Sequence, residues 1–156
     1  MERTLIIFKP DAVQRGLCGE ILSRFEKKGL QIAGLKFMKI PLATAEKHYE
    51  AHKARPFYPG LVAFMTSSPV VVVALEGKDA VVIARNMMGA TFGSKAAAGT
   101  IRGDFGVSNA FNLIHGSDSP EAAQKEIGLF FQAGDIVEWT PTLRTWVYDM
   151  SKGEPE

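Results

Sequence analysis

The chain has 156 residues, of which 46% are hydrophobic and 22% charged, a composition typical of a folded domain whose core needs no disulfide or metal. Its 18 basic and 17 acidic side chains leave a net charge of +1, so no overall field attracts nucleic acid or an anionic membrane. The single cysteine, Cys18, excludes an internal disulfide and a CxxC metal site, and with no recognisable signal peptide or membrane-spanning run the expected location is the cytoplasm.

The chain is predicted to begin with a strand, a helix and a second strand. Residues 4–8 are β-branched or aromatic and predict a buried strand, which ends at Lys9 because Pro10 cannot continue a hydrogen-bonded ladder. Apolar residues recur at helical spacing over 19–28 and predict an amphipathic helix with a glycine cap. Residues 30–40 alternate well enough to predict the second strand.

The middle of the chain predicts helices around a very apolar strand. A helix follows the second strand and carries His48 and His52. These could share a face toward zinc, but H-E-x-x-H is absent and a solvated helix face is favoured. A short helix is expected over 61–65. Near-continuous valines over 69–75 predict a strand buried on both faces, and a helix over 78–88 follows it.

The last part contains the stretch most suited to chemistry. Residues 90–108 are rich in glycine and alanine without a firm period, and a loop of that length is usually functional or disordered. An apolar run over 110–114 predicts a strand, and Ser119 is a typical helix cap. His115 is therefore expected between a strand end and a helix start, where free N–H groups and about half a positive charge favour a neutral imidazole and a nearby anion. An irregular segment over 132–144 follows the helix.

The order of these elements favours a split βαβ arrangement. In that fold of the α+β class, a mostly antiparallel four-stranded sheet carries its helices on one face, here with a helical insertion between the halves. A doubly wound parallel α/β sheet is the alternative, and periodicity alone does not separate the two. No repeat or linker divides the chain, so residues 1–156 are expected to form a single domain.

Known nucleotide-binding loops are absent. No G-x-G-x-x-G follows the first strand, and residues 89–95 have the wrong spacing for a P-loop. Four motifs instead occur in a characteristic order. They are Phe8-Lys9-Pro10-Asp11, Arg55-Pro56-Phe57, Gly99-Thr100-Ile101-Arg102-Gly103-Asp104-Phe105 and Asn112-Leu113-Ile114-His115-Gly116-Ser117-Asp118-Ser119. With them the chain closely resembles the nucleoside diphosphate kinase family from Glu2 to about Phe131.

The resemblance implies a ferredoxin-like core and a Mg²⁺-dependent phosphotransferase. In that family the γ-phosphoryl group of a nucleoside triphosphate, typically ATP, passes to a nucleoside diphosphate by a ping-pong mechanism through a phosphohistidine, maintaining nucleotide pools. His115 matches the phosphorylated nucleophile and Glu126 the acid that binds its other ring nitrogen. Tyr49 and Ser117 match residues beside the histidine, and Lys9 matches a lysine near the transferred phosphate.

The resemblance also implies a nucleotide site that accepts ATP, GTP and other nucleoside di- and triphosphates. Arg85, Thr91 and Arg102 match residues that contact the phosphates. Lys9 and Asn112 match residues that hold the ribose hydroxyls. Phe57 matches an aromatic that stacks on the base, which tolerates every base. Mg²⁺ would arrive on the nucleotide phosphates, since no carboxylate cage is evident and no metal ligand is expected among the side chains.

The chain departs from the family pattern mainly in and near the long loop. Phe92-Gly93 replaces the usual Asn-Pro, Ala98 replaces a common proline, and Phe111 replaces an arginine. Because proline restricts the unfolded chain, Gly93→Pro is expected to raise the thermal midpoint. The apolar tip over 146–148 resembles the tail of hexameric members, so a homo-hexamer is expected, with a homo-tetramer as the alternative.

Rival functions are a nucleic-acid-binding module and a scaffold with vestigial kinase chemistry. The first is disfavoured because no RNP-like string is present and the net charge is only +1, so no nucleic-acid partner is required. A turnover assay separates both rivals from the kinase.

Overall fold

The computed structural model describes residues 1–156 and contains a four-stranded sheet in the order β2-β3-β1-β4. The strands are β1 (Glu2–Phe8), β2 (Gln31–Met38), β3 (Val70–Gly77) and β4 (Ile114–Gly116). All three neighbouring pairs are antiparallel, so β1 and β2 run parallel to each other on either side of β3. This is the split βαβ sheet of the ferredoxin-like α+β class, which confirms the expected fold class and excludes the doubly wound alternative.

Seven α-helices and three short 3₁₀ helices connect the strands. The α-helices are α1 (Pro10–Gln14), α2 (Cys18–Lys28), α3 (Leu42–His48), α4 (Tyr58–Ser67), α5 (Ala80–Met88), α6 (Ile101–Phe105) and α7 (Pro120–Phe130). The 3₁₀ helices are η1 (Glu50–His52), η2 (Gly93–Lys95) and η3 (Arg144–Trp146). None of the helices combines the length and the apolar character needed to cross a membrane.

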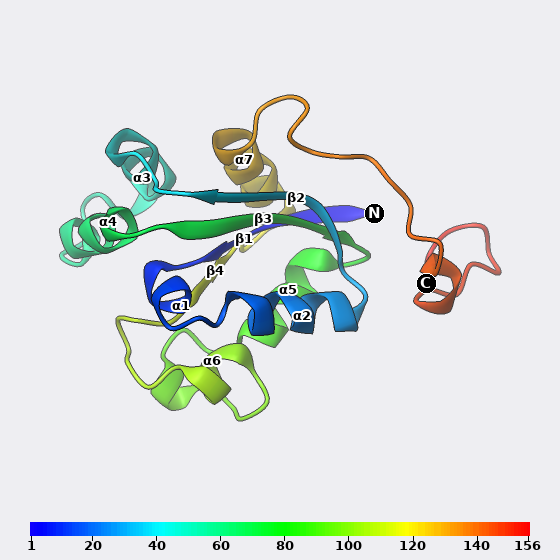
Figure 1. The fold of residues 1–156 in the computed structure, drawn as a ribbon, viewed down its shortest axis with the longest axis horizontal. Coiled ribbons are helices and arrows are strands. Elements are labelled where there is room, and N and C mark those ends of the chain that lie inside the picture. The colour runs from blue at the N-terminus through cyan, green and yellow to red at the C-terminus, as the bar shows by residue number, and fades with distance from the viewer.

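Helices cover both faces of the sheet, whereas one covered face was expected. Figure 1 shows α1, α2, α5 and α6 on one side of the strands and α3 and α7 on the other. Side chains alternate across a strand, and β1 is apolar at every position of its second half. Ile6 and Phe8 therefore join the core under α2 and α5, while Leu5 and Ile7 join the core under α3, α4 and α7.

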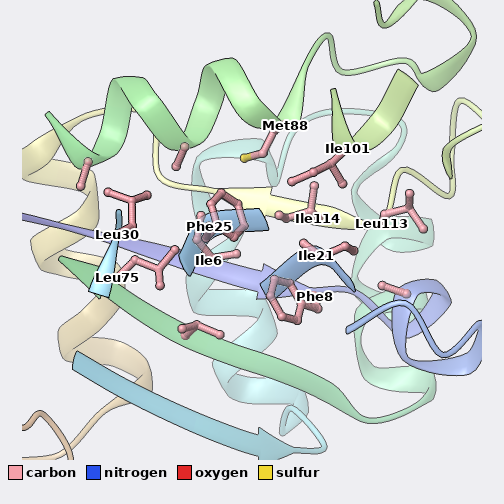
Figure 2. Packing of buried hydrophobic residues seen from close by; sticks show 14 residues of the cluster. Ile6, Phe8, Ile21, Phe25, Leu30, Leu75, Met88, Ile101, Leu113 and Ile114 are labelled. Carbon is pink, nitrogen blue, oxygen red and sulfur yellow. The ribbon is translucent and has the colours of Figure 1, made fainter. Parts of the chain in front are cut away.

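The first of these cores positions the end of β4. Figure 2 shows Phe25 of α2 and Met88 of α5 packed around Ile6 and Ile114 of the two paired strands. All four side chains are at most 2% exposed, so this packing fixes β4 firmly against β1. Because the neighbours in such a core cannot move freely to fill a gap, removing even one methylene group lowers the stability of the fold.

Several predicted boundaries were wrong. Pro10 ends β1 as expected, but it also begins α1 as an N1 proline, a helix that was not predicted. Helix α3 ends at His48, so His52 lies in η1, and α4 is longer than the predicted 61–65. The loop over 90–108 contains η2 and α6, the latter capped by the Thr100 side chain, which accepts a hydrogen bond from Gly103 N at 3.0 Å.

The path of this loop also changes the expectation for Gly93. A Cβ built on Gly93 would lie against the carbonyl of Gly106, closer than real Cβ contacts come. Backbone atoms cannot swing aside as a flexible side chain can, so the expected gain in stability from Gly93→Pro is contradicted.

We therefore expect Gly93→Ala and Gly93→Pro to lower the free energy of unfolding by about 1–3 kcal/mol. The thermal midpoint should fall by roughly 3–10 °C. The matched control is Gly19→Ala in α2, where an added Cβ meets nothing within 4 Å. That change should leave the midpoint unchanged or raise it. Calorimetry of the three variants provides the comparison, and a midpoint raised by Gly93→Ala would show that the loop does not press on this glycine.

Candidate active site

His115 is the middle residue of β4. It was expected between the end of the strand and the next helix, so that expectation was wrong. His115 pairs with Ile7 of β1, and its neighbour Ile114 belongs to the core under α2 and α5. Because alternate residues of a strand face opposite ways, the imidazole lies on the face covered by α3 and α7. The predicted cap of α7 is confirmed, since the Ser119 side chain accepts from Ala122 N at 3.0 Å.

The His115 ring is held by a chain of hydrogen bonds that begins at the β1 backbone. Leu5 N donates to the Ser117 Oγ at 3.1 Å, and that hydroxyl donates to Glu126 Oε2 at 2.6 Å. The same carboxylate oxygen lies 3.1 Å from His115 Nε2. Burial raises the pKa of Glu126, but the hydrogen bonds and charge of His115 and the Ser117 hydroxyl outweigh it and lower the pKa below its usual value.

This arrangement decides which nitrogen of His115 is reactive. An ionised carboxylate only accepts hydrogen bonds, so Nε2 carries the proton that points at Glu126. The neutral ring therefore keeps its lone pair on Nδ1. The structure thus brings Glu126 and Ser117, the two residues expected beside His115, to its ring. The nitrogen that remains free to act as a nucleophile is Nδ1.

Two side chains at the end of α3 border the same ring. The His48 ring stands edge-on to His115 with centroids 4.6 Å apart, and the Tyr49 ring follows at 6.4 Å. His48 was predicted to lie on a solvated face, but it packs against Phe130 of α7 with centroids 5.3 Å apart. Burial and the neighbouring His115 lower the pKa of His48 to about 3, and burial raises the pKa of Tyr49. Both side chains are therefore neutral near pH 7.

A second group of expected residues lies at the start of β4. Lys9 Nζ donates to Asn112 Oδ1 at 2.7 Å, and Asn112 Nδ2 donates to the carbonyl of Thr91 at 2.9 Å. Lys9 is only 8% exposed. Burial, with the nearby charge of Arg102, lowers the pKa of Lys9 to about 8. The structure thus joins Asn112 to a lysine 103 positions before it and to a threonine 21 positions before it.

The two expected arginines bracket His115 through backbone carbonyls. Arg102 donates from Nε to Asn112 O at 3.1 Å, from Nη1 to Gly89 O at 3.2 Å and from Nη2 to Ile114 O at 2.7 Å. Arg85 Nη1 donates to Gly116 O at 3.3 Å. Burial and Arg85 lower the pKa of Arg102 to about 10, so it stays charged at neutral pH. Three of its five N–H donors are occupied, which leaves two for a ligand.

Sequence reasoning assigned no role to Asp11, which sets the backbone before β4. Leu113 has a φ of +72°, a conformation that a non-glycine residue rarely adopts. Its N–H donates to Asp11 Oδ2 at 3.0 Å, and its carbonyl accepts from Lys9 N at 2.8 Å. The acid was present in the first quoted motif, but its contact with Leu113 spans 102 positions and has no local signal.

Phe57 lies outside these networks. It precedes α4 with 53% of its surface exposed, and its ring lies near that of His52, with centroids 5.5 Å apart. An exposed aromatic ring is suited to stacking on a flat partner.

The site favours a polyanion over a bare Mg²⁺ ion. Three cations, Lys9, Arg85 and Arg102, are bonded to residues immediately around β4, against two acids, Glu126 and Asp11. The one group of potential metal ligands, His48 with His115 and Glu126, offers two nitrogens and one carboxylate. Mg²⁺ prefers an all-oxygen octahedron, so this donor set does not fit it as a resident ion.

Comparison with known proteins gives a consistent result. A family model described as nucleoside diphosphate kinase matches residues 2–136. The chain is 57% identical to a nucleoside diphosphate kinase of Gloeobacter violaceus, over 96% of this chain and 100% of the relative. It is 56% identical to one of Pelotomaculum thermopropionicum with the same coverage. The solved structure of a halophilic nucleoside diphosphate kinase from Halobacterium salinarum, in complex with CDP, superposes with a TM-score of 0.93 at 49% identity, over 95% of this chain and 99% of that one.

Proposed function

The chain belongs to the nucleoside diphosphate kinase family and is a phosphotransferase, and from this premise we propose that its reaction passes through a phosphohistidine at His115. The observation that carries the proposal is the hydrogen bond from His115 Nε2 to Glu126, because it leaves the Nδ1 lone pair free to attack phosphorus. We further propose that residues 1–156 act as one domain and that the enzyme works in the cytoplasm.

In the first half-reaction, Nδ1 attacks the γ-phosphorus of the donor. The bond from that phosphorus to the bridging oxygen breaks, and its electron pair leaves on the β-phosphate of the nucleoside diphosphate product. Nε2 keeps its proton, so the phosphorylated ring gains positive charge, which the Glu126 carboxylate stabilises from 3.1 Å away. In the second half-reaction, a terminal oxygen of the acceptor diphosphate attacks the same phosphorus and the P–N bond breaks.

The remaining site residues are proposed to hold the nucleotide. Arg85, Thr91 and Arg102 are proposed to contact the phosphates, where each charge-assisted bond from an arginine contributes about 1.5–3 kcal/mol. Lys9 and Asn112, already bonded at 2.7 Å, serve the ribose hydroxyls, with Lys9 also near the transferred group.

ATP, GTP and other nucleoside di- and triphosphates are the proposed substrates. The CDP complex of the halobacterial relative supports this class of ligand. Mg²⁺ held by the substrate phosphates would neutralise part of their charge. Tyr49 borders His115, with the two ring centroids 6.4 Å apart.

The test of this function is a turnover assay with ATP and a deoxynucleoside diphosphate. The deoxynucleoside triphosphate is the expected product, with parallel double-reciprocal lines, because the two half-reactions share one site. Intersecting lines would indicate direct transfer in a ternary complex, and no turnover at all would favour the scaffold function.

Glu126→Gln and Phe57→Ala are expected to affect different kinetic constants. Glu126→Gln removes the charge that stabilises the phosphorylated ring, so kcat should fall by about two orders of magnitude with little change in KM. Phe57→Ala removes a stacking contact of about 1–3 kcal/mol that ground and transition states share, so mainly KM should rise. Steady-state kinetics of both variants tests this, and the reverse pattern would mean that the two roles are exchanged.

The lowered pKa of Lys9 predicts that activity falls at alkaline pH. The buried ammonium has a pKa of about 8, so the free enzyme loses this charge as pH rises above that value. Since kcat/KM reports ionisations of the free enzyme, it should fall through about pH 8. Lys9→Arg keeps a permanent charge, so its own normalised profile should lack this alkaline limb. The same limb in both proteins would assign it to another group.

We propose a homo-hexamer, with a homo-tetramer as the alternative. The tail leaves Leu143 66% and Trp146 87% exposed, more than an isolated chain of this size has reason to show. Light scattering should give about six times 17.0 kDa. A tetrameric or monomeric mass would refute the hexamer.

A further inference from the structure

We propose that His48, His115 and Glu126 form an inhibitory site for a borderline divalent cation of the Zn²⁺ type. The three side chains come from α3, β4 and α7, and one ligand atom of each lies within 4.8 Å of the others. The site itself needs only this geometry, whereas its inhibitory effect rests on the proposed phosphohistidine function.

The spacing of the ligand atoms is close to what the ion requires. Tetrahedral Zn²⁺ with bonds of about 2.0–2.1 Å holds its ligand atoms about 3.3 Å apart. His115 Nε2 and Glu126 Oε2 already lie 3.1 Å apart. Only His48 must move, by rotating a ring that stands 4.6 Å from the His115 centroid.

His48 is otherwise an unexplained polar group. Both of its ring nitrogens are buried and no protein group forms a hydrogen bond to them, although buried polar atoms are almost always paired. Its ring lies against those of His115 and Phe130, so it has no role as a surface group. A metal ion at this position would satisfy one of the two nitrogens.

The donor set distinguishes this ion from the one that enters with the substrate. Two imidazoles and one carboxylate suit Zn²⁺ and leave a fourth position for water, whereas Mg²⁺ requires oxygen ligands. Excess Mg²⁺ in an assay therefore should not displace the bound ion.

Binding would switch His115 to an unreactive form. Coordination uses the lone pair of Nε2, so the proton that Nε2 donates to Glu126 must leave. A neutral ring then carries its single proton on Nδ1, and the lone pair that attacks phosphorus is lost. Conversely, a ring phosphorylated on Nδ1 is stabilised by Glu126 with its proton on Nε2, and Zn²⁺ would have to displace that proton, so phosphorylation opposes metal binding.

Zn²⁺ titration against a chromophoric chelator tests the site without any measurement of activity. The full-length protein should bind one Zn²⁺ per chain. His48→Phe keeps a ring against His115 but offers no ligand, and should weaken the affinity at least about tenfold. His52→Phe, a matched change in η1 outside the cluster, should bind Zn²⁺ as the wild type does. Equal affinity in all three proteins, or no binding, would overturn the site.

Two further measurements test the inhibitory effect. Phosphorylation of the protein before titration should weaken the Zn²⁺ affinity at least about tenfold, and an unchanged affinity would contradict the proton switch. Zn²⁺ should lower turnover in excess Mg²⁺, and a zinc-selective chelator should restore it. The Zn²⁺ concentration that halves turnover should be at least about tenfold higher for His48→Phe than for the wild type. Equal inhibition of both proteins would place the effect elsewhere. A protein that binds Zn²⁺ through His48 but shows no transferase activity would refute the proposed function and leave the metal site standing.

Discussion

His115→Gln is expected to lower turnover by at least about four orders of magnitude while changing nucleotide affinity only a few-fold. Glutamine places an amide of similar length at the middle of β4 and can still contact Glu126, but it offers no nucleophilic lone pair. The nucleotide contacts proposed for Arg102 and Lys9 remain, because both side chains are held by other residues.

Steady-state rates and calorimetric titration with a nucleoside diphosphate provide the two readouts. Residual activity above about one per cent in contamination-free protein would show that another group receives the phosphoryl group. A parallel loss of affinity would show instead that His115 helps to build the binding site.

Arg102→Met should impair both folding and phosphate binding. Methionine is about as long as the aliphatic part of the arginine side chain, but it has no N–H group. The carbonyls of Gly89, Asn112 and Ile114 therefore lose the hydrogen bonds that Arg102 donates to them. Unsatisfied buried acceptors cost about 1–3 kcal/mol each, partly offset because a buried charge is removed, so we expect a loss of about 2–4 kcal/mol.

Arg85→Met is the matched control for this change. Arg85 makes one partly buried bond, to Gly116 O at 3.3 Å, so its loss should cost less than about 1 kcal/mol while still weakening phosphate binding. Urea unfolding and nucleotide titration of both variants separate the two effects. An equal loss of stability in the two variants would contradict the structural role assigned to Arg102.

The sequence predicted elements whose signals are local. Helix α2 ends at Gly29 with a φ of +101°, as its glycine cap predicted, and Ser119 begins α7 as its capping residue. The continuous valines of β3 correctly predicted a strand buried on both faces. The motifs supplied the candidate site residues, and the roles of those residues remain predictions.

What the sequence did not predict depends on contacts between distant segments. Strand β4 begins only at Ile114 because Leu113 is held in a left-handed conformation by Asp11, far away in the chain. His48 was placed in solvent because its helix pattern is polar, but its ring packs against Phe130 and both ring nitrogens are buried. Gly93 looked replaceable because nothing in the sequence shows that Gly106 lies against it.

Incubation with γ-labelled ATP and Mg²⁺, without an acceptor, tests the phosphohistidine at His115 most directly. The protein should take up close to one phosphate per chain, in an acid-labile and alkali-stable form that is located on His115 and released when a nucleoside diphosphate is added. Label that resists acid, or that is still taken up by His115→Gln, would contradict transfer through this histidine.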